Sequence, residues 1–225
     1  MEYISSDISI QSMLEELNIN KTSESHVVKQ TAKLGETIFD SNKQQTSILF
    51  IVSGLAKKIN TDYQNEFIIN LLKTGNVIGL YNGLTNHAQM EERVIAITAC
   101  TFISIDREYL LNYLAIRPSF MELLIKEMSN TIAKTHNRMM YLSNLSRENR
   151  VAASMLELSK EIGINEGDHI IFPKAITKKI LSDYSRVEYR YFQKLFSKMK
   201  TEHLIDSRGP RIEVNQDLLE EHIGR

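Results

Sequence analysis

The stretch TKKILSDYSRVEYRYFQKLFSKMKTEHLI at residues 177–205 decides how this chain is interpreted. Thr177 is a residue type that caps helices, and the sequence after it predicts a helix to about Tyr184. After a short turn, a second helix is expected from Val187 to Thr201. The chain then reads as strand, turn and strand, in the order Leu204-Ile205, Ser207-Arg208-Gly209-Pro210 and Ile212 to Val214. Two helices joined by a turn and followed by a hairpin predict a winged helix.

Positive charge is concentrated in the same part of the chain. Ten basic and four acidic residues lie between Lys174 and Arg211, although the whole chain has a net charge of −1. Arg190, Lys194 and Lys198 are spaced four residues apart and are expected on one face of the second helix. The opposite face is apolar and consists of Phe192, Leu195, Phe196 and Met199. A helix with one buried and one basic face suits the major groove of DNA, which admits a helix.

We expect Arg190 to make a bidentate contact with guanine, and Lys194 and Lys198 to contact phosphates. The residues expected to contact DNA lie on the two helices and the hairpin turn: Lys178, Lys179, Arg186, Glu188, Tyr189, Arg190, Tyr191, Lys194, Lys198 and Arg208. The alternative interpretation is a solvated helix face, with the interleaved aromatic residues packing the two helices together.

Residues 30 to 106 read as strands. Apolar runs such as Ile48 to Val52, Phe67 to Leu72 and Val94 to Ile105 are separated by turn signals such as Ser53-Gly54. Short strands at this spacing predict an antiparallel barrel or sandwich. Before them, Ser9 to Leu17 is expected to form one short amphipathic helix.

Residues 107 to 162 read as helix. Pro118 can begin a helix because its missing N–H would be unpaired in the first turn anyway, and Gly163 is expected to end another. Between them, residues recur at spacings of three and four to form a heptad seam: Ile125, Met128, Ile132, Thr135, Met139 and Leu142. The seam favours a dimer, and the alternative is an amphipathic helix lying on its own core.

Composition excludes several classes of protein. The single cysteine, Cys100, is expected to be buried and rules out an intramolecular disulfide framework, a cysteine-built zinc site and a cysteine-ligated iron–sulfur cluster. No apolar run approaches about 18 residues and the first residues lack an export signal, so we expect a cytoplasmic protein. The carboxylate pairs Glu91-Glu92 and Glu220-Glu221 read as solvated charge in loop or tail. No catalytic or phosphate-binding motif is present, so we expect neither an enzyme, nor a cofactor, nor a metal site.

An ordered set of motifs along nearly the whole chain resembles the Crp/Fnr family of transcription regulators. The motifs that resemble the family's β-roll are LGETIF at 34–39, LFIVSGLAKK at 49–58, GNVIGL at 75–80 and TACTFISIDREYL at 98–110. RPSF at 117–120 resembles the start of its long dimer helix, and Asn149-Arg150-Val151-Ala152 resembles its hinge. Residues 177–205 fit its helix–turn–helix without a gap.

The resemblance implies an α+β fold in three parts. These are an N-terminal antiparallel β-roll of the cupin-like jelly-roll type at 1–116, a long dimerisation helix at 117–148 and a C-terminal winged helix-turn-helix at 149–225. It implies a homodimer whose two recognition helices enter successive major grooves of a palindromic operator, about 34 Å apart. Contacts with RNA polymerase are expected from Glu36 and the loop Tyr63–Asn65 if the protein is an activator.

The effector pocket implied by the resemblance departs from that of the family's cyclic-nucleotide binders. Those proteins have Gly-Glu where this chain has Gly79-Leu80, and Arg-Ser or Arg-Ala where it has Met90-Glu91. Because leucine cannot accept a hydrogen bond and carboxylates repel phosphate, we expect no control by cyclic AMP. The effector stays unidentified, and the residues aligned with its pocket are Leu71, Gly79, Leu80, Tyr81, Met90, Thr135 and His136.

The DNA reader departs from the family as well. Many members have Ser-Arg-Glu-Thr-Val-Ser-Arg where residues 188–194 read Glu-Tyr-Arg-Tyr-Phe-Gln-Lys, so the family's common operator is not carried over. Arg186 replaces the usual glycine of the turn, which implies strain if its backbone is left-handed. We expect a sequence-specific transcription regulator. The alternative is a small-molecule-sensing adaptor that acts through a protein partner rather than DNA.

Overall fold

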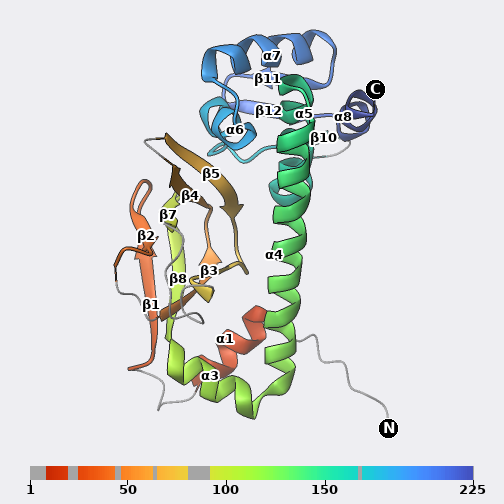
Figure 1. Cartoon of the computed structure of the whole chain (residues 1–225). Helices are drawn as coiled ribbons and strands as arrows, with labels where there is room; N and C mark the ends of the chain where they lie inside the picture. The colour runs from red at the N-terminus through yellow and green to blue at the C-terminus, as the bar shows by residue number, and fades with distance from the viewer. Residues whose placement is uncertain are drawn as a thin grey trace. The chain divides into compact units, whose positions relative to one another are not determined.

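The computed structural model of the chain describes residues 9–19, 25–43, 47–62, 65–80, 92–166 and 169–224 (Figure 1). The chain divides into two compact units, Met1–Lys134 and Thr135–Arg225. The boundary between them lies within one continuous helix, α4 (Pro118–Asn144), so both units contribute to this helix. Pro118 is its first residue, as predicted. No helix among the described residues is both long enough and apolar enough to cross a membrane.

The first unit contains two four-stranded antiparallel sheets, which confirms the predicted all-antiparallel β domain (Figure 1). One sheet has the order β1-β8-β3-β6, with bounds Val27–Ala32, Cys100–Asp106, Ser47–Ser53 and Val77–Ile78. The other has the order β2-β7-β4-β5, with bounds Thr37–Asp40, Glu92–Ala96, Ala56–Asp62 and Asn65–Leu72. The apolar run Val94 to Ile105 is divided between β7 and β8, because Ile97 and Thr98 both donate backbone hydrogen bonds to the Leu55 carbonyl instead of continuing the ladder.

Side chains from both sheets pack into one apolar cluster, and Cys100 is part of it. The cluster consists of Ala32, Ile38, Phe39, Leu49, Ile51, Ala56, Leu72, Ile78, Val94, Ala96, Cys100 and Phe102. The Cys100 thiol donates to the Leu55 carbonyl at 3.2 Å, and burial raises the pKa of this thiol. The prediction of a buried cysteine is therefore confirmed.

A second apolar cluster lies where helices cover the sheet of β3 and β8. It brings together α1 (Ile10–Ile19), α3 (Arg107–Ile116) and the start of α4, and its largest members include Met13, Leu17, Phe50, Ile105, Leu110 and Leu124. The predicted N-terminal amphipathic helix is thus confirmed as α1. An ion pair of 2.7 Å between Arg117 and Glu16 joins α1 to the start of α4.

The second unit contains the predicted winged helix. Its helices are α5 (Arg147–Ile162), α6 (Lys178–Ser185) and α7 (Tyr189–Thr201), and the hairpin consists of β11 (Ile205–Arg208) and β12 (Arg211–Val214). Gly163 is the C-cap of α5, as expected. The hairpin belongs to a four-stranded sheet of order β11-β12-β10-β9, in which β9 (Ile164–Glu166) and β10 (His169–Ile171) were not anticipated from the sequence.

The chain ends in a helix that the sequence analysis missed. The expectation that Glu220 and Glu221 lie in a loop or tail is wrong, because both belong to α8 (Gln216–Ile223). Asn215 caps this helix by accepting a hydrogen bond from the Leu218 N–H at 3.1 Å. Leu219 is fully buried, which explains why so short a segment is helical.

Candidate nucleic-acid interface

Helix α6, which leads into the turn before α7, is capped at both of its ends. Thr177 accepts a hydrogen bond from the Ile180 N–H at the start of α6, as its predicted capping role requires. Arg186 ends α6 with left-handed backbone (φ 53°), and the Ser182 hydroxyl donates to the Val187 carbonyl at 2.7 Å. The condition stated for strain at Arg186 is therefore met, because its left-handed backbone costs about 1–2 kcal/mol relative to a residue in its preferred region.

Glu188 forms the N-cap of α7. Its two carboxylate oxygens accept hydrogen bonds from the N–H groups of Arg190 and Tyr191, each at 3.0 Å. These two bonds, that from Arg190 first, lower the pKa of the Glu188 carboxyl. The helix therefore begins at Tyr189 rather than at Val187, and Arg190 lies in its first turn. Glu188, which sequence reasoning placed among the DNA contacts, has both oxygens engaged by the backbone.

The two faces of α7 differ as the sequence predicts. Phe192, Leu195, Phe196 and Met199 are buried, whereas Arg190 and Lys194 are exposed on the opposite side. Within the described part of the chain, neither of these two basic side chains forms an ion pair or a hydrogen bond. They are therefore available to an external anion.

Lys198, the third member of the predicted basic face, has partners within the protein. Its ammonium lies 2.7 Å from a carboxylate oxygen of Glu148 in the first turn of α5, and 3.7 Å from one of Glu202. His222 of α8 is close to the same carboxylates, with its Nε2 3.5 Å from Glu148. A carboxylate oxygen of Glu148, one of Glu202 and a ring nitrogen of His222 all lie within 4.8 Å of one another. The ammonium of Lys198 is the positive charge next to these two carboxylates.

Other basic residues of the predicted set belong to α6 and to the turn that follows it. The Lys178 ammonium is 4.4 Å from the centre of the Phe196 ring, and Lys179 pairs with Asp183 at 2.5 Å. Arg186 is exposed at the turn. A hollow of about 270 Å³ between the start of α6 and the hairpin turn Gly209-Pro210 is lined by Lys174 and Lys178. This part of the surface is basic and concave.

The aromatic residues of the set have different exposures. Tyr189 is half-buried, whereas Tyr191 is exposed and has the Arg147 guanidinium 5.5 Å from the centre of its ring. Arg147 belongs to the first turn of α5, as does Glu148. The start of α5 therefore contacts α7 at two positions seven residues apart, Tyr191 and Lys198.

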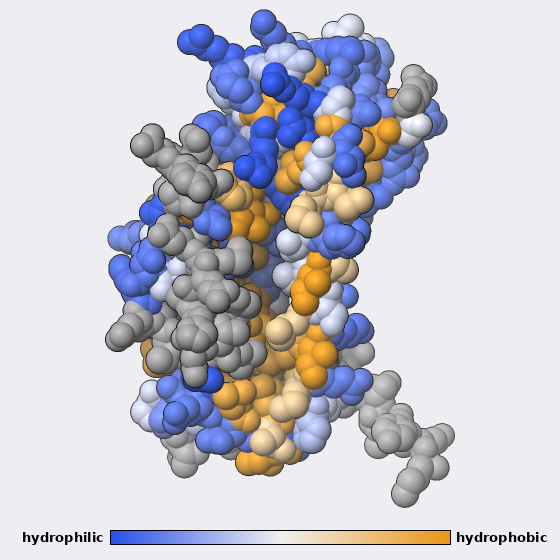
Figure 2. All heavy atoms as spheres, in the orientation of Figure 1, coloured by the Kyte–Doolittle hydropathy of each residue, from blue (hydrophilic) through white to orange (hydrophobic). Residues whose placement is uncertain are grey.

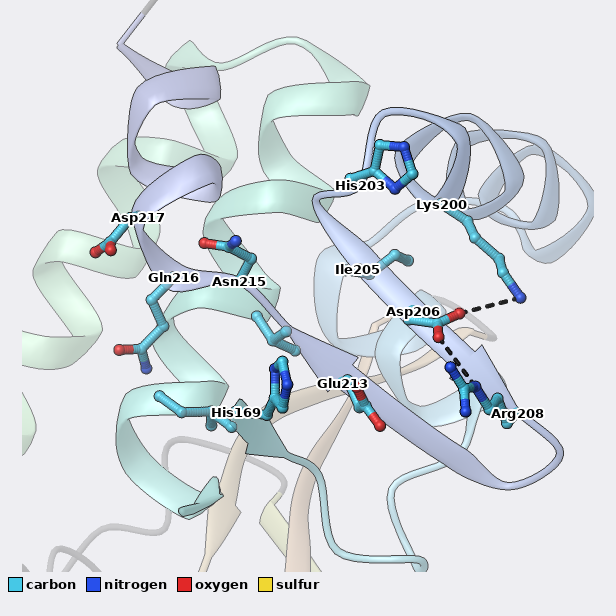
Figure 3. Close-up of a pocket in the computed structure, with 12 residues that line it drawn as sticks. His169, Lys200, His203, Ile205, Asp206, Arg208, Glu213, Asn215, Gln216 and Asp217 are labelled. Carbon is cyan, nitrogen blue, oxygen red and sulfur yellow. Dashed lines mark hydrogen bonds and ion pairs between the residues drawn. The ribbon is translucent and has the colours of Figure 1, made fainter. Parts of the chain in front are cut away.

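A larger hollow of about 700 Å³ is bounded by the hairpin, β10 and the start of α8 (Figure 3). Within it, the Asp206 carboxylate is shared by two cations, with Lys200 at 3.2 Å and Arg208 at 3.3 Å (Figure 3). Lys200 also donates to the Ser207 carbonyl at 2.8 Å. Arg208, predicted as a DNA contact, thus has an internal partner but stays largely exposed.

The predicted heptad seam is an exposed apolar face of α4. Ile125, Ile132 and Met139 are 57%, 67% and 59% exposed, respectively, and Met128 and Thr135 are also exposed, while Leu142 is half-buried. Figure 2 shows orange and pale spheres along the place that α4 occupies in Figure 1. Exposure of such an apolar face to water is unfavourable, and burial against another surface would stabilise it.

A buried polar cluster that sequence reasoning missed joins α4, α5 and α6. The Arg138 guanidinium lies 3.4 Å from the centre of the Tyr184 ring and donates to the Tyr184 carbonyl at 2.5 Å. The Glu157 carboxylate accepts hydrogen bonds from the hydroxyls of Tyr141 and Tyr184 and lies 3.9 Å from Arg138. Arg138 therefore helps to satisfy the carbonyl end of α6 next to the turn that leads into α7. A lone arginine in the polar part of a helix gives no signal of this role.

The residues aligned with the effector pocket are distributed over both units of the chain. Leu71 and Gly79 are buried, and Leu80 is half-buried. A Cβ at Gly79 would lie 3.0 Å from a ring carbon of Phe39, so the interior beside this glycine is filled by an aromatic ring. Thr135 and His136 are exposed on α4 in the second unit, and Tyr81 and Met90 lie outside the described residues.

Glu92 corrects one interpretation made from the sequence. It is only 7% exposed and its carboxylate lies 2.7 Å from the Lys58 ammonium, so it is not solvated charge. Glu92 shares its side of β7 with Val94 and Ala96, both members of the core between the sheets. Strand alternation could have predicted this placement. Glu91 lies outside the described residues.

The residues expected to contact RNA polymerase can be placed only in part. The Glu36 carboxylate accepts a hydrogen bond from the Lys33 N–H at 2.7 Å in an exposed turn. Tyr63 and Gln64 lie outside the described residues.

Comparisons with known proteins agree with this architecture. Residues 29–117 match the family profile of the cyclic nucleotide-binding domain. A cyclic nucleotide-binding domain-containing protein from Listeria monocytogenes is similar in structure, with a TM-score of 0.80, 21% identity, and 92% of this chain and 97% of that chain covered. No curated protein sequence matches the chain significantly.

Two further solved structures extend the similarity to named regulators. A variant of CooA from Carboxydothermus hydrogenoformans has a TM-score of 0.77 at 14% identity, with 97% of each chain covered. A CRP/FNR-family transcriptional regulator from Thermus thermophilus has a TM-score of 0.69 at 18% identity, with 88% of this chain and 99% of that chain covered. Residues 29–117 thus match the cyclic nucleotide-binding domain family, and the chain as a whole has the fold of the Crp/Fnr-family transcription regulators.

Proposed function

We propose that this protein is a homodimeric, sequence-specific DNA-binding transcription regulator in which α7 enters the major groove. The observation that carries the proposal is the outward face of α7, where Arg190 and Lys194 are exposed and have no ion partner among the described residues, while the opposite face is buried. Arg190 lies in the first turn, the part of a recognition helix that reaches base edges in helix-turn-helix proteins. Its guanidinium suits a bidentate contact with guanine, and the Lys194 ammonium suits a phosphate.

Basic residues beside α7 support the same role. The hollow lined by Lys174 and Lys178 lies between the start of α6 and the hairpin turn, and it presents cations and a helix N-terminus to a phosphate. Arg186 and Lys179 extend the positive surface along the turn. Such contacts fix the orientation of the protein on the duplex, whereas base contacts from Arg190 and its neighbours specify the sequence.

The exposed apolar face of α4 supports dimerisation. The seam residues Ile125, Met128, Ile132 and Met139 have the spacing of a parallel coiled coil and are exposed in the single chain. Two copies joined along this face would present two α7 helices to the two halves of a palindromic operator.

The effector of such a regulator is not cyclic AMP in our proposal. Leu80 and Met90 replace the residue types that hold ribose and cyclic phosphate in the family's cyclic-nucleotide binders, and two carboxylates, Glu91 and Glu92, follow Met90 in the sequence. The single cysteine also excludes an iron–sulfur cluster ligated by four cysteines. Contact with RNA polymerase through Glu36 stays a prediction.

The test is selection of bound duplexes from a random-sequence pool, followed by binding measurements with the selected operator. Arg190→Ala should cost about 1–3 kcal/mol against the operator and relax the preference at one base position. Lys194→Ala should weaken binding to every duplex and reduce the salt slope by about one unit. If no sequence is enriched and binding does not depend on salt, the protein is better explained as a small-molecule-sensing adaptor that acts through a protein partner.

A further inference from the structure

The basic residues of α7 occupy three different directions around the helix axis. At about 100° per residue, Lys194 lies roughly 40° from Arg190, whereas Lys198 lies roughly 80° to one side and Lys200 roughly 80° to the other. Buried Phe192 and Met199 lie opposite Arg190. Arg190 and Lys194 therefore share the outward face, while Lys198 and Lys200 lie on its two flanks.

Each flank lysine is held by a neighbouring element. Lys198 is paired with Glu148 of α5 at 2.7 Å, and the hydrogen bond from Lys198 to Glu148 raises the pKa of this ammonium. Lys200 is paired with Asp206 of β11 at 3.2 Å (Figure 3) and also donates to the Ser207 carbonyl. The C-terminal half of α7 is thus linked on one side to the start of α5 and on the other to the hairpin.

Turning Lys198 toward a DNA phosphate would leave an unfavourable charge behind. Glu148 and Glu202 would lose their ammonium partner, and His222 alone would remain close to both carboxylates. Two uncompensated carboxylates near a phosphate backbone repel it and offset the attraction that Lys198 would gain. Lys194 has no such partner among the described residues, so its ammonium binds phosphate without this loss.

We propose that Lys198 and Lys200 are positioning residues that fix the C-terminal half of α7 against α5 and β11 and make no phosphate contact. Arg190 and Lys194 are then the two cations of α7 that face DNA. This inference rests on the proposed function and narrows it, because a basic face of three residues is reduced to two.

The salt dependence of operator binding separates the two roles. Lys194→Gln, Lys198→Gln and Lys200→Gln each remove one charge from the full-length protein with little change in side-chain length. Lys194→Gln should lower the slope of log affinity against log salt by about 0.9, whereas the other two variants should leave the slope unchanged. A loss of about 0.9 in Lys198→Gln would overturn the proposal for that residue.

A double-mutant cycle with Glu148 separates the two roles of Lys198 further, because they predict opposite changes in operator affinity for Glu148→Gln. If Lys198 acts by holding Glu148, Glu148→Gln should weaken operator binding roughly two- to fivefold, and adding Lys198→Gln should weaken it no further. If Lys198 instead contacts phosphate, Glu148→Gln should strengthen binding because it removes a repulsive carboxylate. Lys198→Arg keeps the pair with Glu148 and should retain wild-type affinity.

A measurement without DNA separates failure of this inference from failure of the proposed function. Reductive methylation of the free protein, followed by mass spectrometry, should modify Lys198 more slowly than Lys194, and Glu148→Gln should abolish the difference. Equal rates in the wild type would overturn the inference even if the operator is bound. Slow modification of Lys198 in a protein that binds no duplex would overturn the proposed function and leave the lysine's internal pairing intact.

Discussion

At the scale of single residues, Gly54 and Gly75 have the same kind of backbone but different surroundings. Both have positive φ, 97° and 89°. A Cβ at Gly54 would lie 2.4 Å from the Ala99 carbonyl oxygen and 2.8 Å from the Cys100 sulfur, whereas one at Gly75 would meet nothing within 4 Å. The two positions therefore separate backbone strain from steric overlap.

We expect Gly75→Ala to lower the free energy of unfolding by about 1–2 kcal/mol, the cost of left-handed backbone. Gly54→Ala should cost at least about 2 kcal/mol more, because the backbone of Ala99 must also move. Urea unfolding of the two variants gives the comparison. Equal losses would show that the contact between Gly54 and the turn at Ala99 is not as close as described.

Loss of Arg138 should destabilise the second unit. Arg138→Met removes the cation beside Glu157 and the donor to the Tyr184 carbonyl, so we expect a loss of about 2–4 kcal/mol in the free energy of unfolding. Arg147→Met removes an exposed guanidinium that lies over the Tyr191 ring, and should cost less than about 1 kcal/mol. Similar losses in both variants would contradict a structural role of the buried cluster.

Glu157 predicts a particular pH dependence. Burial raises the pKa of its carboxyl above the value in the unfolded chain. The stability that its proton contributes is therefore complete below the ordinary carboxyl pKa and is lost as pH rises through the raised value. We expect the stability of the wild type relative to Glu157→Gln to fall as pH rises through this window, measured by urea unfolding at a series of pH values.

Glu188 provides a control, because its contribution to stability should change with pH in the opposite direction. Backbone hydrogen bonds lower the pKa of its carboxyl, so its contribution is present above the ordinary carboxyl pKa and is lost as pH falls through the lowered value. The wild type relative to Glu188→Gln should thus gain stability with rising pH. Parallel trends in the two variants would contradict the assigned shifts.

Single residues were predicted well where local geometry decides their state, and less well where a distant element does. Thr177 and Arg186 follow from the chemistry of caps and turns, because the backbone that needs them is adjacent in sequence. The pairing of Lys198 depends on Glu148, fifty positions earlier in the chain. Spacing along α7 alone cannot show that another helix approaches one flank of it.

At the scale of elements, α4 is the helix whose exposed face makes the clearest prediction. Ile132→Lys combined with Met139→Lys should give monomers, because two like charges would replace apolar contacts along the proposed seam. Operator affinity should then fall by about 100-fold or more, since the two half-sites are no longer bound together. Sedimentation equilibrium and anisotropy measure the two effects.

The matched control places the same charges on the other side of the helix. Asn130→Lys combined with Asn137→Lys lies roughly opposite the seam and should leave both the dimer and its affinity unchanged. A dimer that survives the seam variant would show that the interface lies elsewhere on the chain.

Helices and strands with a strong hydrophobic periodicity, or with a clear cap or turn residue at their ends, were predicted from the sequence. Short elements without such signals were not. The helices that begin at Pro118 and Lys178 have a proline start or a cap, and the hairpin of β11 and β12 has Gly209-Pro210 at its turn. The strands β9 and β10 are three residues each and gain their stability by joining the hairpin sheet. The helix α8 is stabilised by burying Leu219, which its local sequence does not reveal.

At the scale of the whole molecule, the cyclic nucleotide-binding domain makes a testable negative prediction. Cyclic AMP titrated into the full-length protein should give no binding heat up to millimolar ligand, and operator affinity should not change when it is added. Micromolar affinity would overturn the interpretation of Leu80 and Met90. The physical reason is the loss of both a hydroxyl acceptor and a phosphate-binding cation at the aligned positions.

The order of motifs made the architecture predictable, because each motif marks a turn or boundary that the fold requires. The motif LFIVSGLAKK, for example, contains Gly54. A larger residue does not fit at this position, because the Ala99 carbonyl lies too close to it. The division into two units was not predictable in the same way, since its boundary falls inside α4 and no proline or glycine marks it.

The burial of Cys100 has a practical consequence for spectroscopy. Since this is the only cysteine of the chain and its thiol is enclosed by the β-sheet core, maleimide reagents should leave it unlabelled in the native state. A fluorophore or spin label can therefore be attached to a single engineered cysteine, for example at exposed Asn130, without first removing the native one.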